Sequence, residues 1–306
     1  MVVVHRAGTL FCLASAAAFG AMAIFGKLAY EDGTTAGTLL AVRFILASAV
    51  FWVVMVVARR FAEIRALARR DVVIALLLGA VGYAAQAGAY FAALERIEAS
   101  LLALLLYTFP AMVTVAAIAI GRERFAVRRA VALGLASAGG VLIVGGVGSG
   151  GLDPLGAALG LAAAAIYSTY ILTSDGIASR MRPEILSTLV CTGAAVSLTV
   201  GGAAIGILDP GAVSAAGWGW LACLSLVSTV AAIALFFAGL RRVGPSAAAI
   251  LSTVEPLVTV LLAFAVFGER LSPLQIAGGA LVLSAVPALH ARRVRLRRMR
   301  VAHAES

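Results

Sequence analysis

Charged residues are scarce in this chain. Asp, Glu, Lys and Arg make up 12% of its 306 residues, whereas 62% of the residues are hydrophobic. Soluble domains carry about 25% charged residues, because charged side chains cover much of a water-exposed surface. The composition therefore excludes an ordinary soluble protein and predicts a membrane protein.

Cysteine and histidine are also rare. The three cysteines lie inside apolar runs, where a thiol behaves as a small hydrophobic group, and the three histidines lie at or near the chain ends. Neither residue type has the spacing of a zinc site or of a disulfide framework. The sequence predicts no metal and no cofactor.

Long apolar runs take up most of the chain. A bilayer core about 30 Å thick needs roughly 20 apolar residues per helix. Ten runs reach about that length, at 8–29, 36–57, 71–93, 97–120, 127–147, 154–174, 184–207, 215–238, 244–267 and 273–291. Barrel strands would instead alternate apolar and polar residues. We predict an all-α polytopic membrane protein with ten transmembrane helices, the first of them a span and not a cleaved signal.

The basic residues follow the connections in a regular way. When the N-terminus is placed inside the cell, only Arg96 and Arg270 fall in outer connections, Lys27 and Arg43 fall within spans, and every other Lys or Arg lies inside. Positive residues in short loops mark the cytoplasmic side. We therefore predict a multi-pass protein of the cytoplasmic (inner) membrane with both termini in the cytoplasm. The basic tail, 292–306, then lies against anionic lipid head groups rather than nucleic acid.

The chain matches itself at an offset of 146 residues. YFAALERIEAS at 90–100 aligns with FFAGLRRVGPS at 236–246, Pro110 aligns with Pro256, and Glu123–Arg124 aligns with Glu269–Arg270. Each half holds five spans, and because five is odd the second half crosses the membrane with opposite polarity. Inverted repeats can exchange conformations around a central site. We divide the chain into a first repeat, an outer connector, a second repeat and a basic cytoplasmic tail, at 1–147, 148–153, 154–291 and 292–306.

These features resemble the EamA-type branch of the drug/metabolite transporter superfamily. The resemblance covers nearly the whole chain and is carried by a proline in the fourth span of each half, by the pair Glu255-Pro256, and by GERLSPLQ at 268–275. The first half departs from the pattern, with Phe109 in place of Glu255 and RERFAVRR in place of GERLSPLQ. The resemblance implies a carrier, often an exporter of amino acids, other metabolites or toxic compounds, with a cavity between the halves.

Three charged residues lie within the spans, where charge is costly and usually functional. Lys27 lies near the outer end of span one, and we interpret it as reaching the membrane interface. Arg43 lies about two turns into span two and requires a partner. Burial favours the neutral form of a carboxyl group, so one hypothesis for Glu255 is that it binds and releases a transported proton. Two others are that it is a static partner of Arg43 and that it binds a substrate amine.

Polar residues at helical spacing extend this candidate site. Pro256 has no N–H, so the carbonyl of Ser252, four residues earlier, loses its helical donor and is free for a ligand or water; Pro110 frees the carbonyl of Leu106 in the same way. The predicted substrate-cavity residues are Arg43, Tyr83, Gln86, Tyr107, Pro110, Tyr167, Tyr170, Ser228, Thr229, Ser252, Glu255, Pro256 and Thr259.

The predicted function is secondary active transport of a small-molecule solute by alternating access, with protons as a candidate coupling ion. An integral-membrane enzyme acting on lipid-linked substrates is the main alternative. Such an enzyme would carry acidic or histidine clusters at a membrane face, whereas these connections offer mainly arginines and are too short for a catalytic domain. A carrier fold retained as a sensor or scaffold is a third possibility. We predict a protein that is not an enzyme.

Overall fold

The computed structural model describes residues 6–121, 127–145, 153–178, 180–243, 248 and 251–285. Throughout these ranges the chain forms helices joined by short turns, and none of the described residues lies in a strand. The predicted basic tail, Glu123–Arg124 and the outer connector apart from Asp153 lie outside the described residues.

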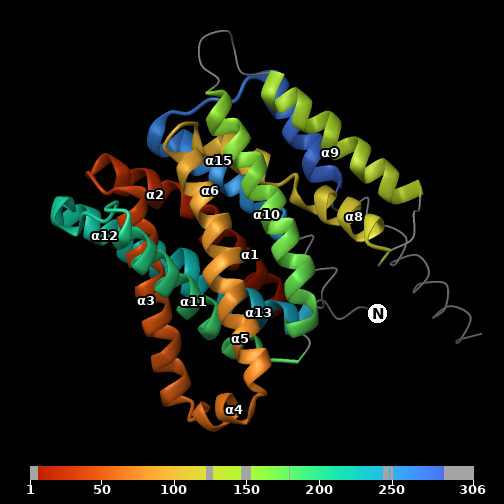
Figure 1. The fold of residues 1–306 in the computed structure, drawn as a ribbon. Helices are drawn as coiled ribbons and strands as arrows, with labels where there is room; N and C mark the ends of the chain where they lie inside the picture. Colours follow the sequence, from red (N-terminus) through yellow and green to blue (C-terminus); the bar gives the residue numbers. More distant parts are fainter. Residues whose placement is uncertain are drawn as a thin grey trace, which may run out of the picture.

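The first half contains α1 to α9. Their bounds are α1 Arg6–Gly20, α2 Met22–Glu31, α3 Ala36–Val57, α4 Phe61–Ala66, α5 Arg69–Leu77, η1 Leu78–Tyr83, α6 Ala84–Leu94, α7 Ala99–Leu106, α8 Phe109–Ala119 and α9 Val127–Gly145. The short helix α4 lies at the far end of the hairpin between α3 and α5 (Figure 1).

The second half repeats this order. Its elements are α10 Pro154–Ala178, α11 Pro183–Ala204, η2 Pro210–Ala212, α12 Ala215–Ser225, η3 Leu226–Ala231, α13 Ala232–Val243, α15 Val254–Phe267 and a last helix over Pro273–Ala285.

These elements join into the predicted spans. Seven helices are long and apolar enough to cross a membrane, and three shorter apolar helices occupy the predicted fifth, ninth and tenth spans, at Ala130–Ile143, Val254–Phe267 and Pro273–Ala285. The fold class is confirmed: the chain is an all-α polytopic membrane protein with ten transmembrane helices in two inverted five-helix repeats.

The inverted repeat is visible in the helix contacts. In the first half α1 packs against α13 and α15, which are spans eight and nine. Its counterpart α10 packs against α6 and α7, which belong to spans three and four. The first span of each half thus crosses over to the third and fourth spans of the other, while α3 and α11 pack against each other between them. This exchange brings the two halves together along one long interface.

The fourth span of each half is interrupted, and the third span of each half contains a π-helical segment. Span four is split at Tyr107 and Thr108 into α7 and α8, and span nine turns at Thr253 before α15 begins. Each break lies two or three residues before a proline, Pro110 or Pro256, because the proline ring excludes the helical hydrogen bond at that point. Spans three and eight each contain a π-helical segment, η1 and η3, and such segments are frequent at functional sites.

The fifth and tenth spans cross at glycines. A β-carbon on Gly139 would lie 2.5 Å from the carbonyl oxygen of Gly278, and one on Gly278 would lie 2.6 Å from that of Gly139. Real β-carbons do not approach backbone oxygens so closely, so both positions require glycine. Small residues of this kind let membrane helices approach.

Candidate substrate cavity

A cavity of about 550 Å³ lies between the two halves. This volume lies within the range of small-molecule sites. Most of the residues predicted from the sequence lie on its wall: Arg43, Tyr83, Gln86, Tyr107, Pro110, Tyr167, Tyr170, Ser252 and Glu255. They come from spans two, three, four, six and nine, so the tertiary fold collects side chains from both repeats.

The rest of the wall is largely apolar and was missed from the sequence. It includes Phe19, Met22, Phe109, Leu186, Ser187, Val190, Cys191, Ile233, Phe236, Phe237 and Leu240. A search for polar residues in apolar spans cannot single out these side chains, because they look like ordinary membrane-facing or core residues. The pair Phe236-Phe237 did carry one signal, since it opens the repeated FFAGLRRVGPS segment.

Four predicted residues do not line the cavity. Thr229 lies behind it, where its hydroxyl oxygen accepts a hydrogen bond from Arg43. Ser228 is fully buried on the same π-helical segment. Thr259 donates to the carbonyl of Gly20 at 2.9 Å, one turn beyond Glu255 where α1 packs on α15, and Pro256 is buried at the start of α15. Helical spacing placed Ser228, Thr229 and Thr259 on the cavity face, but α1 packs on η3 and α15, and Arg43 bonds to Thr229.

Aromatic rings form a continuous side of the cavity. The ring centroids of Phe109 and Tyr167 are 4.8 Å apart, those of Tyr167 and Tyr170 6.2 Å, and those of Tyr170 and Tyr83 5.6 Å. Tyr107 continues the series at 5.8 Å from Phe109. Such a wall offers apolar area and ring faces that attract cations.

Arg43 is 2% exposed and brings a fixed positive charge to the cavity. Its Nε donates to the Thr229 hydroxyl at 2.9 Å, and its guanidinium carbon lies 5.0 Å from the Phe44 ring centroid and 5.5 Å from that of Phe91. A side-chain hydrogen bond also joins it to Tyr83, so within the described residues its partners are hydroxyl groups and aromatic faces rather than a carboxylate. A buried guanidinium without a counter-charge favours an anionic group on a bound ligand.

Glu255 is paired with Tyr107. The Tyr107 hydroxyl lies 3.0 Å from Oε2 of Glu255 and 2.6 Å from the carbonyl oxygen of Ser252, the carbonyl freed by Pro256. In the described part of the chain no ion pair joins Glu255 to Arg43, so the hypothesis of a static ion pair has no contact to support it. The cavity therefore holds a cation and an acid that remain separate.

Glu269, which is not among the cavity-lining residues, joins the two repeats. Its carboxylate forms an ion pair with Lys27 at 2.7 Å and accepts hydrogen bonds from the backbone N–H groups of Ala99 and Ser100 and from the Ser100 hydroxyl. These donors lie at the start of α7, where a helix favours negative charge. Burial raises the pKa of the Glu269 carboxyl, but the bonds from Lys27 and Ser100 outweigh it and hold the pKa below its usual value.

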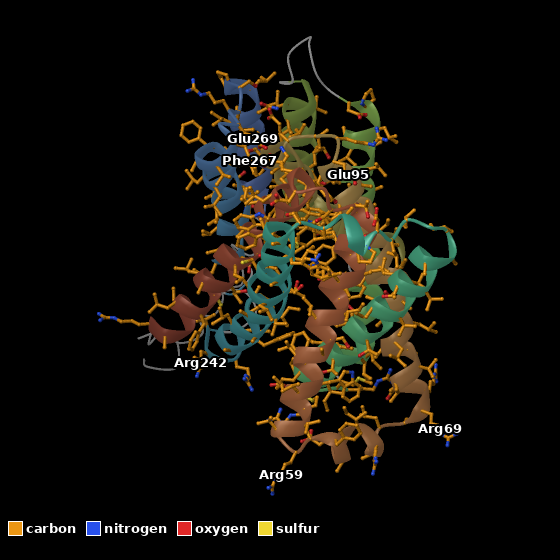
Figure 2. The ribbon with its side chains drawn as sticks, turned by 90° about the vertical axis from the view of Figure 1, so that its left-hand side faces the viewer. Arg59, Arg69, Glu95, Arg242, Phe267 and Glu269 are labelled. Atoms are coloured by element: carbon orange, nitrogen blue, oxygen red, sulfur yellow. The ribbon has the colours of Figure 1, made fainter. Side chains whose placement is uncertain are left out.

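This contact changes the interpretation of Lys27. We predicted that Lys27 reaches the membrane interface, but its ammonium group is directed to Glu269 and lies 5.2 Å from the Phe267 ring centroid. Glu269 follows Gly268, whose φ of 70° ends α15 in a left-handed turn that glycine adopts without strain. Figure 2 places Phe267 and Glu269 toward the same end of the molecule as Glu95, away from Arg59, Arg69 and Arg242.

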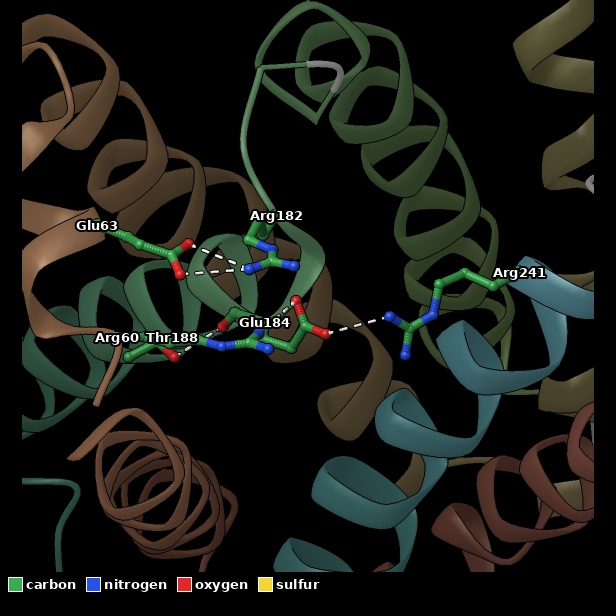
Figure 3. Close-up of polar contacts among 6 residues, drawn as sticks. All are labelled: Arg60, Glu63, Arg182, Glu184, Thr188 and Arg241. Atoms are coloured by element: carbon green, nitrogen blue, oxygen red, sulfur yellow. Dashed lines mark hydrogen bonds and ion pairs between the residues drawn. The ribbon is translucent and has the colours of Figure 1, made fainter. Parts of the chain in front are cut away.

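The opposite end carries exposed ion pairs. Glu184, in the first turn of α11, lies between Arg60 at 3.6 Å and Arg241 at 3.9 Å, and Arg182 pairs with Glu63 at 3.2 Å (Figure 3). Each exposed pair contributes about 0–1 kcal/mol. Glu184 and Arg241 are close in sequence to the cavity-lining residues Leu186, Ser187 and Leu240, so weakly paired charges lie near this end of the cavity.

Taken together, the fold and the cavity define a helical membrane protein with a solute-sized chamber between two inverted halves. A profile of the EamA-like transporter family matches residues 6–145 and 154–288. The match covers nearly the whole chain, and the chain belongs to this family.

Curated proteins with similar sequences are also named as transporters. The chain is 26% identical over 278 residues to the uncharacterized transporter YcbK of Bacillus subtilis (strain 168), with 89% of each chain covered. It is 29% identical over 204 residues to an uncharacterized transporter of Archaeoglobus fulgidus, covering 64% of this chain and 69% of that one. A solved crystal structure of a protein 18% identical superposes with a TM-score of 0.66 over 94% of this chain and 98% of that chain, which supports the fold. Family membership gives the chain a transporter role and implies a small-molecule solute.

Proposed function

We propose that this protein is a secondary active carrier of the cytoplasmic membrane that works by alternating access and exports small amphipathic metabolites. The two repeats, 1–147 and 154–291, exchange conformations around the cavity. One observation carries the proposal: the cavity lies between the two halves, which the Lys27–Glu269 contact also joins, where α7 meets the loop after α15. We infer that this contact closes one end of the chamber, as one state of such a cycle requires.

The closed end is the outer end under this proposal. The arginine-rich connections mark the cytoplasmic side, and cavity residues such as Ser187 and Leu240 lie close in sequence to that side, near Glu184 and Arg241. The structure then corresponds to an inward-facing state. Both termini lie in the cytoplasm in this orientation.

The chemistry of the cavity favours a solute with an apolar or aromatic body and ionised groups. Arg43 offers a cation with no carboxylate partner among the described residues, and Glu255 offers an acid hydrogen-bonded to Tyr107. The aromatic series from Tyr83 to Phe109 offers a surface for flat or apolar groups of a solute. An amino acid with a large side chain combines these features.

Flux into proteoliposomes tests the proposal. Aromatic amino acids, nucleosides and cationic drugs are offered with and without a pH gradient, to the natural chain and to Arg43→Gln. Loss of a hydrogen bond to a charged group costs about 1.5–3 kcal/mol, so we expect solutes with a carboxylate to lose about tenfold or more of their flux, and the cationic drugs to lose less. Arg96→Gln, at an exposed surface pair with Asp153, is the matched control. The carrier proposal fails if no solute moves above empty liposomes.

A further inference from the structure

The Tyr107 hydroxyl touches two groups that act as acceptors. The carbonyl oxygen of Ser252 lies 2.6 Å from it, and Oε2 of Glu255 lies 3.0 Å from it. Both separations lie within the range of O–H···O hydrogen bonds. Tyr107 belongs to the break in span four, and both partners belong to the break in span nine. The hydroxyl therefore connects the two interrupted spans, one from each repeat.

A hydroxyl group has a single proton to donate. When Glu255 is ionised, the carboxylate and the carbonyl can only accept, so Tyr107 can bond fully to one of them. When Glu255 carries a proton on Oε2, it donates to the Tyr107 oxygen, and Tyr107 donates to Ser252. Both short contacts are then hydrogen bonds in a single chain from Glu255 through Tyr107 to Ser252. The geometry in the structure therefore fits a protonated Glu255.

Loss of the proton breaks this chain at a defined place. A charged acceptor makes the stronger hydrogen bond, so the Tyr107 proton turns to the carboxylate and leaves the Ser252 carbonyl. Pro256 has already removed the helical donor to that carbonyl. Ser252 and Glu255 both line the cavity, so two neighbouring acceptors become available to a solute.

We propose that Tyr107 is the positioning residue that couples the proton on Glu255 to the break in span nine, so that one proton is exchanged for the N–H donors of a bound amine or ammonium group. The inference rests on the proposed carrier function. In the exchange the Glu255 O–H bond breaks, the proton leaves to cavity water, and solute N–H groups bond to the Ser252 carbonyl and the carboxylate.

Glu255 is the carboxyl group among the ionisable residues that face the break in span nine. Of the elements packed on α15, α7 leads to Tyr107, α2 carries Lys27 at the Glu269 end, and α1 carries Cys12 against Gly239 of α13. Across the cavity lie Arg43, Tyr83, Tyr167, Tyr170 and Cys191. Arginine stays charged, and tyrosine and cysteine ordinarily titrate well above the range of a carboxyl group.

Hydrogen exchange of the purified full chain tests the coupling without any solute. The measurement is the exchange rate of backbone amides in 254–260 between roughly pH 5 and pH 8, corrected by an unstructured peptide of the same sequence. Losing one hydrogen bond of about 1 kcal/mol corresponds to about fivefold faster opening. In the natural chain we expect the rate to rise by about that factor as Glu255 loses its proton.

Two variants distinguish the contribution of Glu255 from that of Tyr107. Glu255→Gln keeps a donor toward Tyr107 and should hold the slow rate at every pH. Tyr107→Phe keeps the ring but releases the Ser252 carbonyl, so it should show the fast rate at every pH. Tyr167→Phe removes a hydroxyl from the same cavity, and we expect it to respond to pH as the natural chain does.

The outcomes are distinct. If Tyr107→Phe keeps the pH response of the natural chain, or if Glu255→Gln responds as the natural chain does, the inferred coupling is wrong even when solutes are transported. If no solute moves in liposomes but the exchange pattern is as expected, the carrier proposal fails while the coupling between Tyr107 and Glu255 stands.

Discussion

At the scale of single residues, Glu269 joins the ends of three helices. Its carboxylate binds Lys27 of span one and the first two N–H groups of α7, from the turn that Gly268 starts after α15. The side chain of Glu269 is 5% exposed. A buried carboxylate is stable in such a place because several donors replace the water that it loses. The acid of the GER sequence is thus a closing contact between the two repeats.

Replacing Glu269 by Gln should destabilise the protein. The change removes the ion pair and weakens the bonds to α7, at a cost of about 1–3 kcal/mol. Because the pKa of Glu269 is lowered on folding, its contribution is fully present above the ordinary value of 4.5 and is lost as the pH falls through the lowered value. Thermal unfolding in detergent should therefore show a Tm gap between the natural chain and Glu269→Gln at pH 7 that narrows under acid conditions.

The matched control for this prediction is Glu95→Gln, an exposed acid at the same end of the molecule. We expect its Tm to stay with that of the natural chain. A gap of equal size for both variants, or a gap for Glu269→Gln that does not change with pH, would contradict the role assigned to Glu269.

At the scale of the helices, the interrupted spans determine where backbone groups become available. Span nine turns at Thr253, and the carbonyl of Ser252 bonds to Tyr107 instead of to a helical N–H. Pro154 and Pro183 have no such effect, because they stand at the first residue of α10 and α11, where a helix has no partner for the N–H.

Replacing Pro256 by Ala should straighten span nine. The new N–H can donate to Ser252 and adds a hydrogen bond of about 1 kcal/mol, so we expect an unchanged or higher Tm together with reduced solute flux. Pro183→Ala should change neither. The measurements are Tm in detergent and flux in liposomes. Unaltered flux in Pro256→Ala would show that the break is not needed for transport.

At the scale of the whole molecule, the halves are joined by exchanged contacts. Span one packs on spans eight and nine, and span six packs on spans three and four. Under the proposed alternating access, movement of one half against the other would therefore shift the cavity wall on both sides at once. The weak ion pairs of Glu184 involve Arg60 and Arg241, the chain neighbours of Arg59 and Arg242, and Figure 2 shows those two arginines at the end of the molecule opposite Glu269.

Labelling with a membrane-impermeant maleimide tests the predicted orientation of the molecule in the membrane. In a chain whose cysteines Cys12, Cys191 and Cys223 are replaced, Arg65→Cys should react only from the cytoplasmic side, and Glu95→Cys only from the outside. Both positions are exposed. The physical reason is the retention of arginine-rich loops in the cytoplasm. The reverse labelling pattern would overturn the assigned orientation and, with it, the inward-facing state.

Much of the architecture was determined by the sequence alone. Apolar runs of membrane-spanning length leave no alternative to helices in a bilayer, and an odd number of spans in each repeat requires the second half to be inverted. The prolines at 110 and 256 and the charges at 43 and 255 were likewise visible, because they break an otherwise apolar pattern.

The tertiary structure decided which of these residues are in contact. Helical spacing placed Thr259 and Ser252 on one face, yet α1 covers Thr259 while Ser252 lies in the cavity beside Tyr107. The pairing of Lys27 with Glu269 joins residues 242 positions apart in the chain. Spacing reports only neighbours along one helix, whereas contacts between repeats depend on how closely small residues let the helices approach.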